Sequence, residues 1–256
     1  MTAIAVTADD FGLCREIDEA ICLLHDRGIV RRASLIVNTP SFDTSVAALR
    51  ERPALEVAIH LNLTDGQPVL PADAVPTLVD DRGRFHGGRH YGIVGRILSG
   101  RMRRDEVHRE WRAQIAKAHG AGLALHELNS HGHLHLLPQL HDIVLALRRE
   151  FNIPQVRLVH SFEWPRGVLL HLCSLGLRRK LKRDGISAAW PDRTFGLRHP
   201  GSIDTRIKLG DLATGERSTV ELIVHPSRGT NAYHDRWGYA GDDVLNWLLG
   251  NSPSKP

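Results

Sequence analysis

Two adjacent aspartates follow a short apolar run at the start of the chain. The run is Ala3-Ile4-Ala5-Val6, and it leads directly into Thr7-Ala8-Asp9-Asp10-Phe11-Gly12. An apolar run of this length, closed by a turn signal, is typical of a buried strand. We therefore expect Asp9 and Asp10 at the carboxyl end of a strand, which is where α/β folds place their functional residues.

Two neighbouring carboxylates repel each other unless a cation or a shared proton relieves the repulsion. A strand that ends in Asp-Asp therefore indicates a metal site, or an acid/base pair beside one. A structural interpretation is equally open at this point, because Asp10 in a polar loop can also cap the helix that follows.

Strand-like and helix-like segments alternate along the chain. Apolar runs predict strands at residues 33–37, 55–63, 123–130, 156–159 and 220–226. Helical periodicity predicts helices at residues 15–27, 41–50, 91–98, 105–119, 141–150, 168–183 and 242–249. This alternation is the βαβ rhythm of a parallel sheet.

The length of 256 residues suits one domain. We expect it to span residues 1–250, with a frayed tail at 251–256. The net charge of +4 comes from scattered arginines, so no nucleic-acid partner is expected. Three cysteines without a CxxC pair, and an N-terminus without a leader-like segment, predict a cytoplasmic protein.

Two segments break the regular rhythm. Residues 64–90 are rich in proline and glycine, and we interpret them as a loop that covers the active face rather than a disordered insertion. Basic residues crowd the end of the predicted helix at 168–183. They favour the helix dipole, and the alternative is contact with an anionic lipid surface or a phosphate-bearing substrate.

Histidines are the compositional outlier, with sixteen in the chain. His60, His131 and His225 each lie at the carboxyl end of a predicted strand, as the aspartate pair does. In a parallel barrel these ends meet at one face. One aspartate with two histidines leaves open positions for water and substrate, as in catalytic zinc sites, and also suits iron or nickel.

His131, His133 and His135 alternate, so an extended backbone would point them to the same side. His133 and His135 would line the substrate groove or support His131, and a solvent-exposed histidine turn is the structural alternative. Trp237 is expected in a loop, where it would stack on a sugar ring or be buried.

These residues resemble the YdjC family of carbohydrate deacetylases. The resemblance covers nearly the whole chain and is carried by four stretches, Thr7-Ala8-Asp9-Asp10-Phe11-Gly12, His60-Leu61-Asn62-Leu63-Thr64, Asn129-Ser130-His131-Gly132-His133-Leu134-His135 and Glu221-Leu222-Ile223-Val224-His225-Pro226. Within the family, the sequence is most similar to the branch associated with hopanoid lipid biosynthesis. That branch also has Asn at the position of Asn129, where the chitooligosaccharide deacetylases have Asp.

The resemblance implies an α/β fold, a distorted (β/α) barrel with parallel strands inside and helices outside. It implies a metal-dependent hydrolase that removes an N-acetyl group from an amino sugar and releases acetate. One divalent ion, Zn or Mg, would be held by Asp10, His60 and His131. Asp9 would be the general base and His225 the general acid. The expected substrate contacts are Asn62, His133, His135 and Trp237.

Two alternatives use the same residues differently. A metal-dependent phosphoesterase on a similar barrel would need ligands for two or three metals. A barrel that only binds a glycan or glycolipid would have no use for an acid and a base around a metal. The substrate would be a free, nucleotide-linked or lipid-linked N-acetylated sugar, and the lipid form would add peripheral membrane contact. A homodimer is a further expectation, and the stretch between Phe195 and Val220 is short for the family.

Overall fold

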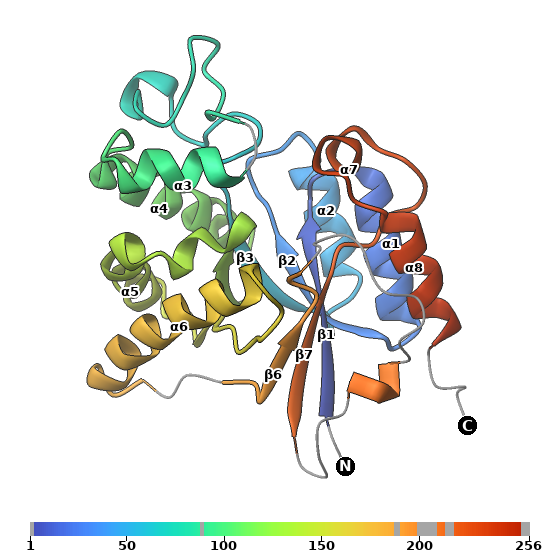
Figure 1. The fold of residues 1–256 in the computed structure, drawn as a ribbon. Helices are drawn as coiled ribbons and strands as arrows, with labels where there is room; N and C mark the ends of the chain where they lie inside the picture. The colour runs from blue at the N-terminus through green and yellow to red at the C-terminus, as the bar shows by residue number, and fades with distance from the viewer. Residues whose placement is uncertain (1–2, 88–89, 187–189, 199–208, 213–217, 252–256) are drawn as a thin grey trace.

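The computed structural model describes residues 3–87, 90–186, 190–198, 209–212 and 218–251. Within these ranges the protein forms one seven-stranded parallel sheet in the order β5-β4-β3-β2-β1-β7-β6. The sheet is curled into a half-barrel with helices around it (Figure 1). The predicted fold class, a distorted (β/α) barrel, is confirmed.

The elements have the following bounds. The strands are β1 (Ala3–Phe11), β2 (Val30–Leu35), β3 (Glu56–Leu61), β4 (Leu125–Ser130), β5 (Gln155–Val156), β6 (Arg193–Phe195) and β7 (Thr219–Val224). The α-helices are α1 (Arg15–Asp26), α2 (Phe42–Arg50), α3 (His90–Leu98), α4 (Arg104–Gly120), α5 (His141–Glu150), α6 (Arg166–Arg183), α7 (Ala232–Trp237) and α8 (Gly241–Gly250). Short 3-10 helices are η1 (Ala72–Ala74), η2 (His131–Leu136), η3 (Pro138–Leu140) and η4 (Leu209–Leu212).

The central strand is β1, which pairs with β2 on one side and with β7 on the other. Five of the six residues of β3 and of β7 are buried, as expected for parallel strands with both faces covered. The outer strands β5 and β6 have two and three residues, and they do not pair with each other among the described residues. The barrel therefore stays open between β5 and β6.

The long helices match the periodicity of the sequence, and α5 has the predicted bounds. Two short elements, β6 and α7, were not predicted. The expectation that Trp237 lies in a loop is wrong, since it is the last residue of α7. Asn231 caps this six-residue helix, its side chain accepting from the backbone N–H groups of Tyr233 and His234. So short a helix carries too few turns for a periodic signal.

The loop expected at residues 64–90 is anchored by buried acids on α4. Glu110 accepts hydrogen bonds from the backbone N–H groups of Val69 and Leu70 at 2.8 and 3.0 Å. Glu106 accepts from Thr77 N at 2.8 Å. The loop rises at the end of the molecule toward which β1 runs (Figure 1). Its role as a cover over the site stays a prediction.

Several expectations concern residues outside the described ranges. These are the tail beyond Asn251, most of the stretch between Phe195 and Val220, and residues 88–89 at the end of the loop. The division into one domain at 1–250 stays a prediction. No helix within the described ranges is both long and apolar enough to cross a membrane.

Candidate metal centre and active site

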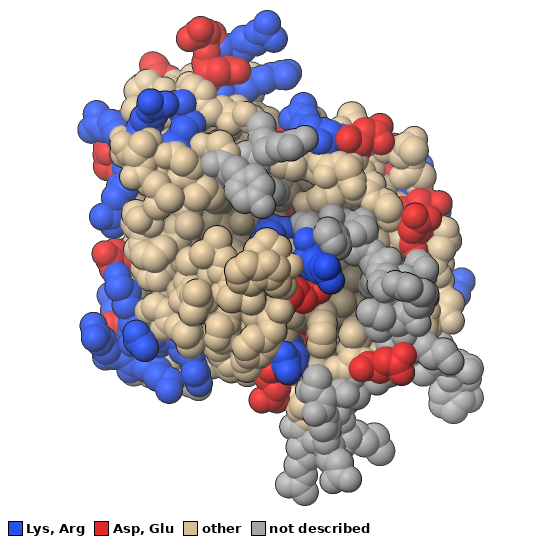
Figure 2. Space-filling view, in the orientation of Figure 1, with Lys and Arg blue, Asp and Glu red and all other residues tan. Residues whose placement is uncertain are grey.

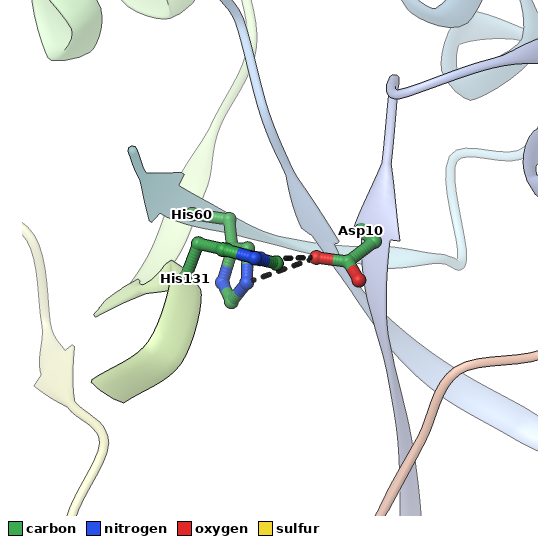
Figure 3. Close-up of side chains that lie close together, drawn as sticks. All are labelled: Asp10, His60 and His131. Atoms are coloured by element: carbon green, nitrogen blue, oxygen red, sulfur yellow. Dashed lines mark hydrogen bonds and ion pairs between the residues drawn. The ribbon is translucent and has the colours of Figure 1, made fainter. Parts of the chain in front are cut away.

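Three buried side chains from separate elements meet at the carboxyl ends of the strands: Asp10 of β1, His60 of β3 and His131 at the start of η2 (Figure 3). Asp10 Oδ1 lies 2.8 Å from His131 Nδ1 and 3.4 Å from His60 Nε2. One potential ligand atom from each residue falls within 4.8 Å of the others. These are the three residues expected to hold the metal.

The backbone at Asp10 breaks the regular alternation of β1. Its φ is 72°, in the left-handed region that non-glycine residues rarely occupy. The pairing of β1 with β2 is irregular between Ala8 and Phe11. In a regular strand Asp9 and Asp10 would point to opposite faces. Here His60 and His225 act on the ionisation of both carboxylates, so both lie at the same site.

Asn129 on β4 sets the orientation of His60. Its Oδ1 lies 2.6 Å from His60 Nδ1. An amide oxygen can only accept, so Nδ1 carries the proton and Nε2 presents its lone pair toward Asp10. The amide nitrogen of Asn129 donates to Glu127 Oε1 at 2.9 Å and to Ser34 Oγ at 3.0 Å. Asn129 thus holds a metal-facing imidazole in the tautomer that binds metal.

Arg157 holds the other aspartate. Its guanidinium is fully buried and bonds Asp9 through two nitrogens, at 2.8 Å to Oδ2 and 3.0 Å to Oδ1. Ser34 Oγ also donates to Asp9 Oδ1, at 2.6 Å. Burial opposes ionisation of Asp9, but the Arg157 charge, with help from His60 and His225, holds the pKa of this carboxyl well below its usual range.

Sequence reasoning missed both Arg157 and Ser34 as parts of the site. A signal for Arg157 was present, since it stands as a single charge inside the apolar run 156–159. A charge in such a run requires a buried partner. Ser34 left no comparable signal, because a small hydroxyl is ordinary in a strand.

His225 follows the last residue of β7, and its Nε2 lies 3.9 Å from Asp10 Oδ2. Burial lowers its pKa to about 4, and the charges of Asp10 and Asp9 partly oppose the shift. The Tyr239 ring packs against it with centroids 4.9 Å apart, a contact that the sequence did not predict. Trp237 lies edge-on to His131, with ring centroids 5.5 Å apart.

The backbone is extended only as far as Ser130, so the alternation of His131, His133 and His135 does not place them on one side of a strand. Residues 131–136 form the 3-10 turn η2, with left-handed φ values of 65° at Gly132 and 60° at His133. Both His133 and His135 are buried, so a solvent-exposed histidine turn is wrong. His135 is held between Ser130 Oγ at 2.9 Å and the carbonyl oxygen of Arg157 at 3.1 Å. A substrate contact by either residue stays a prediction.

Asn62 lies fully buried just after β3, where its side chain organises the following turn. Its Oδ1 accepts from Thr64 N at 2.8 Å, and its Nδ2 donates to the carbonyl oxygen of Asp65 at 2.9 Å. A direct contact between Asn62 and substrate stays a prediction.

The donor set fits a divalent metal ion. One carboxylate and two imidazoles suit zinc and other first-row divalent ions. Burial opposes ionisation of Asp10, but His131 and His60 keep its pKa well below the usual range, so the carboxylate is available as a ligand. These residues are compatible with a divalent metal without selecting one element.

The chain is similar in sequence to a known family of proteins. Residues 3–247 match the family of YdjC-like proteins. A carbohydrate deacetylase of Brevibacillus brevis is 38% identical over 246 residues, which cover 91% of this chain and 95% of the relative. A carbohydrate deacetylase of Oceanobacillus iheyensis is 34% identical over 151 residues, 59% of this chain and 63% of the relative.

A solved structure shares the fold. It belongs to a protein of Enterococcus faecalis V583 described as a cellobiose-phosphate cleavage protein. The TM-score is 0.74 at 23% sequence identity, with 98% of this chain and 91% of that chain covered. The family match spans all five residues of the candidate centre, Asp9, Asp10, His60, His131 and His225. This chain therefore belongs to the YdjC-like family.

Proposed function

We propose that this protein is a metal-dependent carbohydrate deacetylase that hydrolyses the N-acetyl group of an amino sugar and releases acetate. The relatives named carbohydrate deacetylases support this activity. The observation that carries it is the buried group of Asp10, His60 and His131, with Asp9 and His225 beside it. This arrangement joins a metal site with two separate proton carriers.

Each side chain has a role in the proposed reaction. Asp10, His60 and His131 would hold the divalent ion, which supplies Lewis-acid polarisation of the amide carbonyl. Asp9 takes a proton from the attacking water, and Arg157 and Ser34 keep its carboxylate ionised and fixed in place. His225 gives a proton to the amide nitrogen as the C–N bond breaks.

The two proton carriers have different affinities for a proton. His225 has a pKa of about 4, whereas the pKa of Asp9 lies well below its usual range. A proton shared between them therefore rests on His225 and leaves Asp9 as the free base. Environments that separate two pKa values in this way are typical of acid/base assignments. With a pKa of about 4, His225 is neutral at neutral pH, so the proton that Asp9 takes from water passes to His225 before it reaches the amide nitrogen. Both residues then end the cycle in the state in which they began it.

A phosphoesterase is the less favoured alternative. Such enzymes commonly clamp phosphate between two metal ions. Among the described residues, one group with three potential metal ligands was found. One site fits amide hydrolysis better than a two-metal displacement.

Substrate contacts form a further part of the proposal. Trp237 is the best placed of the four candidates, because it borders His131 and is only partly buried. His133, His135 and Asn62 would act by shaping the pocket wall. We propose an N-acetylated sugar as the partner, with no nucleic acid. Cytoplasmic action, a homodimer and the hopanoid-associated branch stay predictions.

The activity is tested by acetate release from N-acetylated sugars, with metal content measured on the same samples. Asp9→Asn and His225→Ala are expected to keep the metal and to lose about 10²–10⁴-fold in turnover, because each removes one proton transfer. His60→Ala and His131→Ala are expected to lose the metal.

His126→Ala is the matched control, since His126 is an exposed histidine on β4. It should retain both metal and activity. Wild-type acetate release by Asp9→Asn would reject Asp9 as the base. Full metal retention in both His60→Ala and His131→Ala would reject the ligand set.

A further inference from the structure

Large apolar side chains gather on the solvent side of α6 and of the segment before it. Within the described residues, five large hydrophobic side chains are more than half exposed, and four of them lie between residues 162 and 172. They are Phe162, Trp164, Leu169 and Leu172, with exposed fractions of 57%, 73%, 61% and 58%. We call these four residues the apolar patch. Exposed apolar side chains that gather in this way mark interaction surfaces, whereas scattered ones are ordinary.

The exposure of these side chains follows from the way α6 packs on the core. Its buried residues are spaced by seven, three and four positions, at Gly167, Ser174, Leu177 and Leu181, which places them along one stripe of the helix. Leu169 and Leu172 lie off this buried stripe. The helix therefore has one apolar side toward the core and a second apolar surface toward solvent, although a solvent side normally carries polar residues.

Positive charge continues along the same helix. The 18 residues of α6 include six Lys or Arg residues and no Asp or Glu. Lys180 pairs with Asp142 at 2.6 Å, and Arg178 lies over the Trp190 ring at 4.5 Å. The other cations near the C-terminus are exposed and make no ion pair with a described residue. They are Arg179, Lys182 and Arg183, which we call the basic cluster.

The surface over α6 shows the same division. In Figure 2 the lower left part of the molecule is largely uncharged in its middle, and Lys and Arg side chains crowd its outer edge. This is where α6 runs in Figure 1, with its C-terminal end at the edge.

The start of α6 also borders the candidate metal centre. The helix packs against η2, which begins at His131. Arg166, the first residue of α6, lies close enough to His133 in that turn for the two side chains to interact electrostatically. The apolar patch therefore adjoins the site, while the basic cluster lies farther along the same helix.

We propose that this face docks the protein on an anionic membrane surface. The apolar patch would enter the interfacial layer, where Trp is favoured, and the basic cluster would lie among the lipid phosphates. Amphipathic surface helices bind membranes through this combination of apolar area and positive charge. Charge complementarity favours this occupant, because a second copy of α6 would bring six cations and no Asp or Glu of its own against these cations. The docking adds to the proposed reaction and does not supply its chemistry.

Vesicle sedimentation tests the docking directly. The wild-type protein is expected to bind phosphatidylcholine vesicles that contain phosphatidylglycerol, and to bind far less to pure phosphatidylcholine. Neutralising the basic cluster with Arg179→Gln, Lys182→Gln and Arg183→Gln together should weaken partitioning about a hundredfold, since each cation near the surface contributes about fivefold. Trp164→Ser should weaken it about tenfold through lost apolar burial.

Two matched controls leave α6 intact. Leu98→Ser removes a leucine of 57% exposure on α3. A triple variant neutralises exposed arginines elsewhere, at Arg27, Arg82 and Arg101. Both controls should bind vesicles like the wild type. The proposal is overturned if the wild-type protein does not bind anionic vesicles. It is also overturned if the variants of the apolar patch and of the basic cluster bind these vesicles as tightly as the wild type does.

Two further measurements separate the other outcomes. Light scattering tests whether the apolar patch is instead a dimer interface. If Trp164→Ser converts a dimer to a monomer and leaves vesicle binding unchanged, membrane docking is overturned. Acetate release from a water-soluble N-acetylated sugar should be the same in the patch variants and the wild type. Acetate release without vesicle binding rejects only the docking, and vesicle binding without acetate release rejects only the proposed function.

Discussion

Asp9 and Asp10 are the same residue type at adjacent positions, and their surroundings give them different properties. Asp9 is fixed by the Arg157 guanidinium, whereas Asp10 faces His60 and His131. Each carboxylate stays ionised despite complete burial, Asp9 chiefly through Arg157 and Asp10 chiefly through His131. Partner geometry, and not residue type, therefore separates the proposed base from the proposed ligand.

Asn129 is the residue whose replacement best tests the buried polar network. In Asn129→Asp an oxygen replaces the amide nitrogen that donates to Glu127 and Ser34. The new carboxylate would then lie buried beside that of Glu127. Because the two negative charges repel each other there, we expect the free energy of unfolding at neutral pH to fall by about 2–4 kcal/mol. Denaturant unfolding measures the change.

Asn246→Asp is the control for this change. Asn246 also donates to a carboxylate, that of Asp242 at 3.4 Å, but the pair is exposed on α8. Solvent screening should leave its stability nearly unchanged. An equal loss in both variants would show that the Asn129 network has no special role.

Glu221 predicts a pH dependence of stability. Burial raises its pKa from 4.5 to about 7, with Arg157 opposing and Glu127 adding to the shift. The folded protein thus holds a proton that the unfolded chain releases above pH 4.5. This contribution to stability is complete below pH 4.5 and is lost as the pH rises through about 7.

Glu221→Gln should remove that part of the pH dependence. Across this pH interval the free energy of unfolding of the wild type is expected to fall relative to that of the variant. Buried histidines with lowered pKa values, such as His135 and His225, add the same opposite slope to both proteins and cancel in the difference. Parallel pH profiles for the two proteins would contradict a raised pKa at Glu221.

At the scale of the element, the end of β1 depends on Gly12. Its φ is 92°, and an added Cβ would lie 2.5 Å from the carbonyl oxygen of Ile36. Its N–H donates to Asp18 Oδ1 at 2.6 Å, which ties the strand end to α1. The two residues before it are Asp10 and Phe11, so the backbone at Gly12 helps to position the metal-facing carboxylate.

Gly12→Ala should therefore destabilise the fold by about 1–3 kcal/mol through strain and steric conflict. Gly28→Ala provides the control, because Gly28 has a similar φ of 76° but no atom within 4 Å of an added Cβ. Its cost should be limited to backbone strain, about 1 kcal/mol. Denaturant unfolding of both variants measures the difference, and equal losses would exclude the close approach to Ile36 as the cause.

At the scale of the whole molecule, the candidate metal centre links parts of the chain that are distant in sequence. Asp10, His60 and His131 come from the start, the first quarter and the middle of the chain, and converge where the parallel strands end. The sheet is open between β5 and β6, so strand pairing does not close the barrel among the described residues. A bound ion would hold three of these segments together.

Metal binding should therefore raise the thermal stability of the whole fold. A divalent ion at about 100 times its Kd contributes about 2.7 kcal/mol, provided that it binds only the folded state. The thermal midpoint of the wild type should rise on metal addition and fall after chelation. Asp10→Asn should respond weakly, whereas Asp43→Asn, at an exposed position on α2, should respond as the wild type does. Equal metal responses in Asp10→Asn and the wild type would contradict the role of Asp10.

The sequence by itself determined the rhythm of strands and helices and the location of His60 and His225 at strand ends. These features depend on local periodicity and on turn residues, which act within a few positions of the chain. The same local rules explain why α5 was predicted with its observed bounds, and why the short elements β6 and α7 were missed.

Only the tertiary structure decided how the charges are paired. Arg157 lies 148 positions from Asp9, and Asn129 lies 69 positions from His60. The left-handed backbone at Gly132 and His133 likewise breaks the alternation of histidines, which in the sequence continues to His135. Periodicity specifies which face a residue occupies, whereas a buried charge selects its partner through contacts that exist only after the strands have come together.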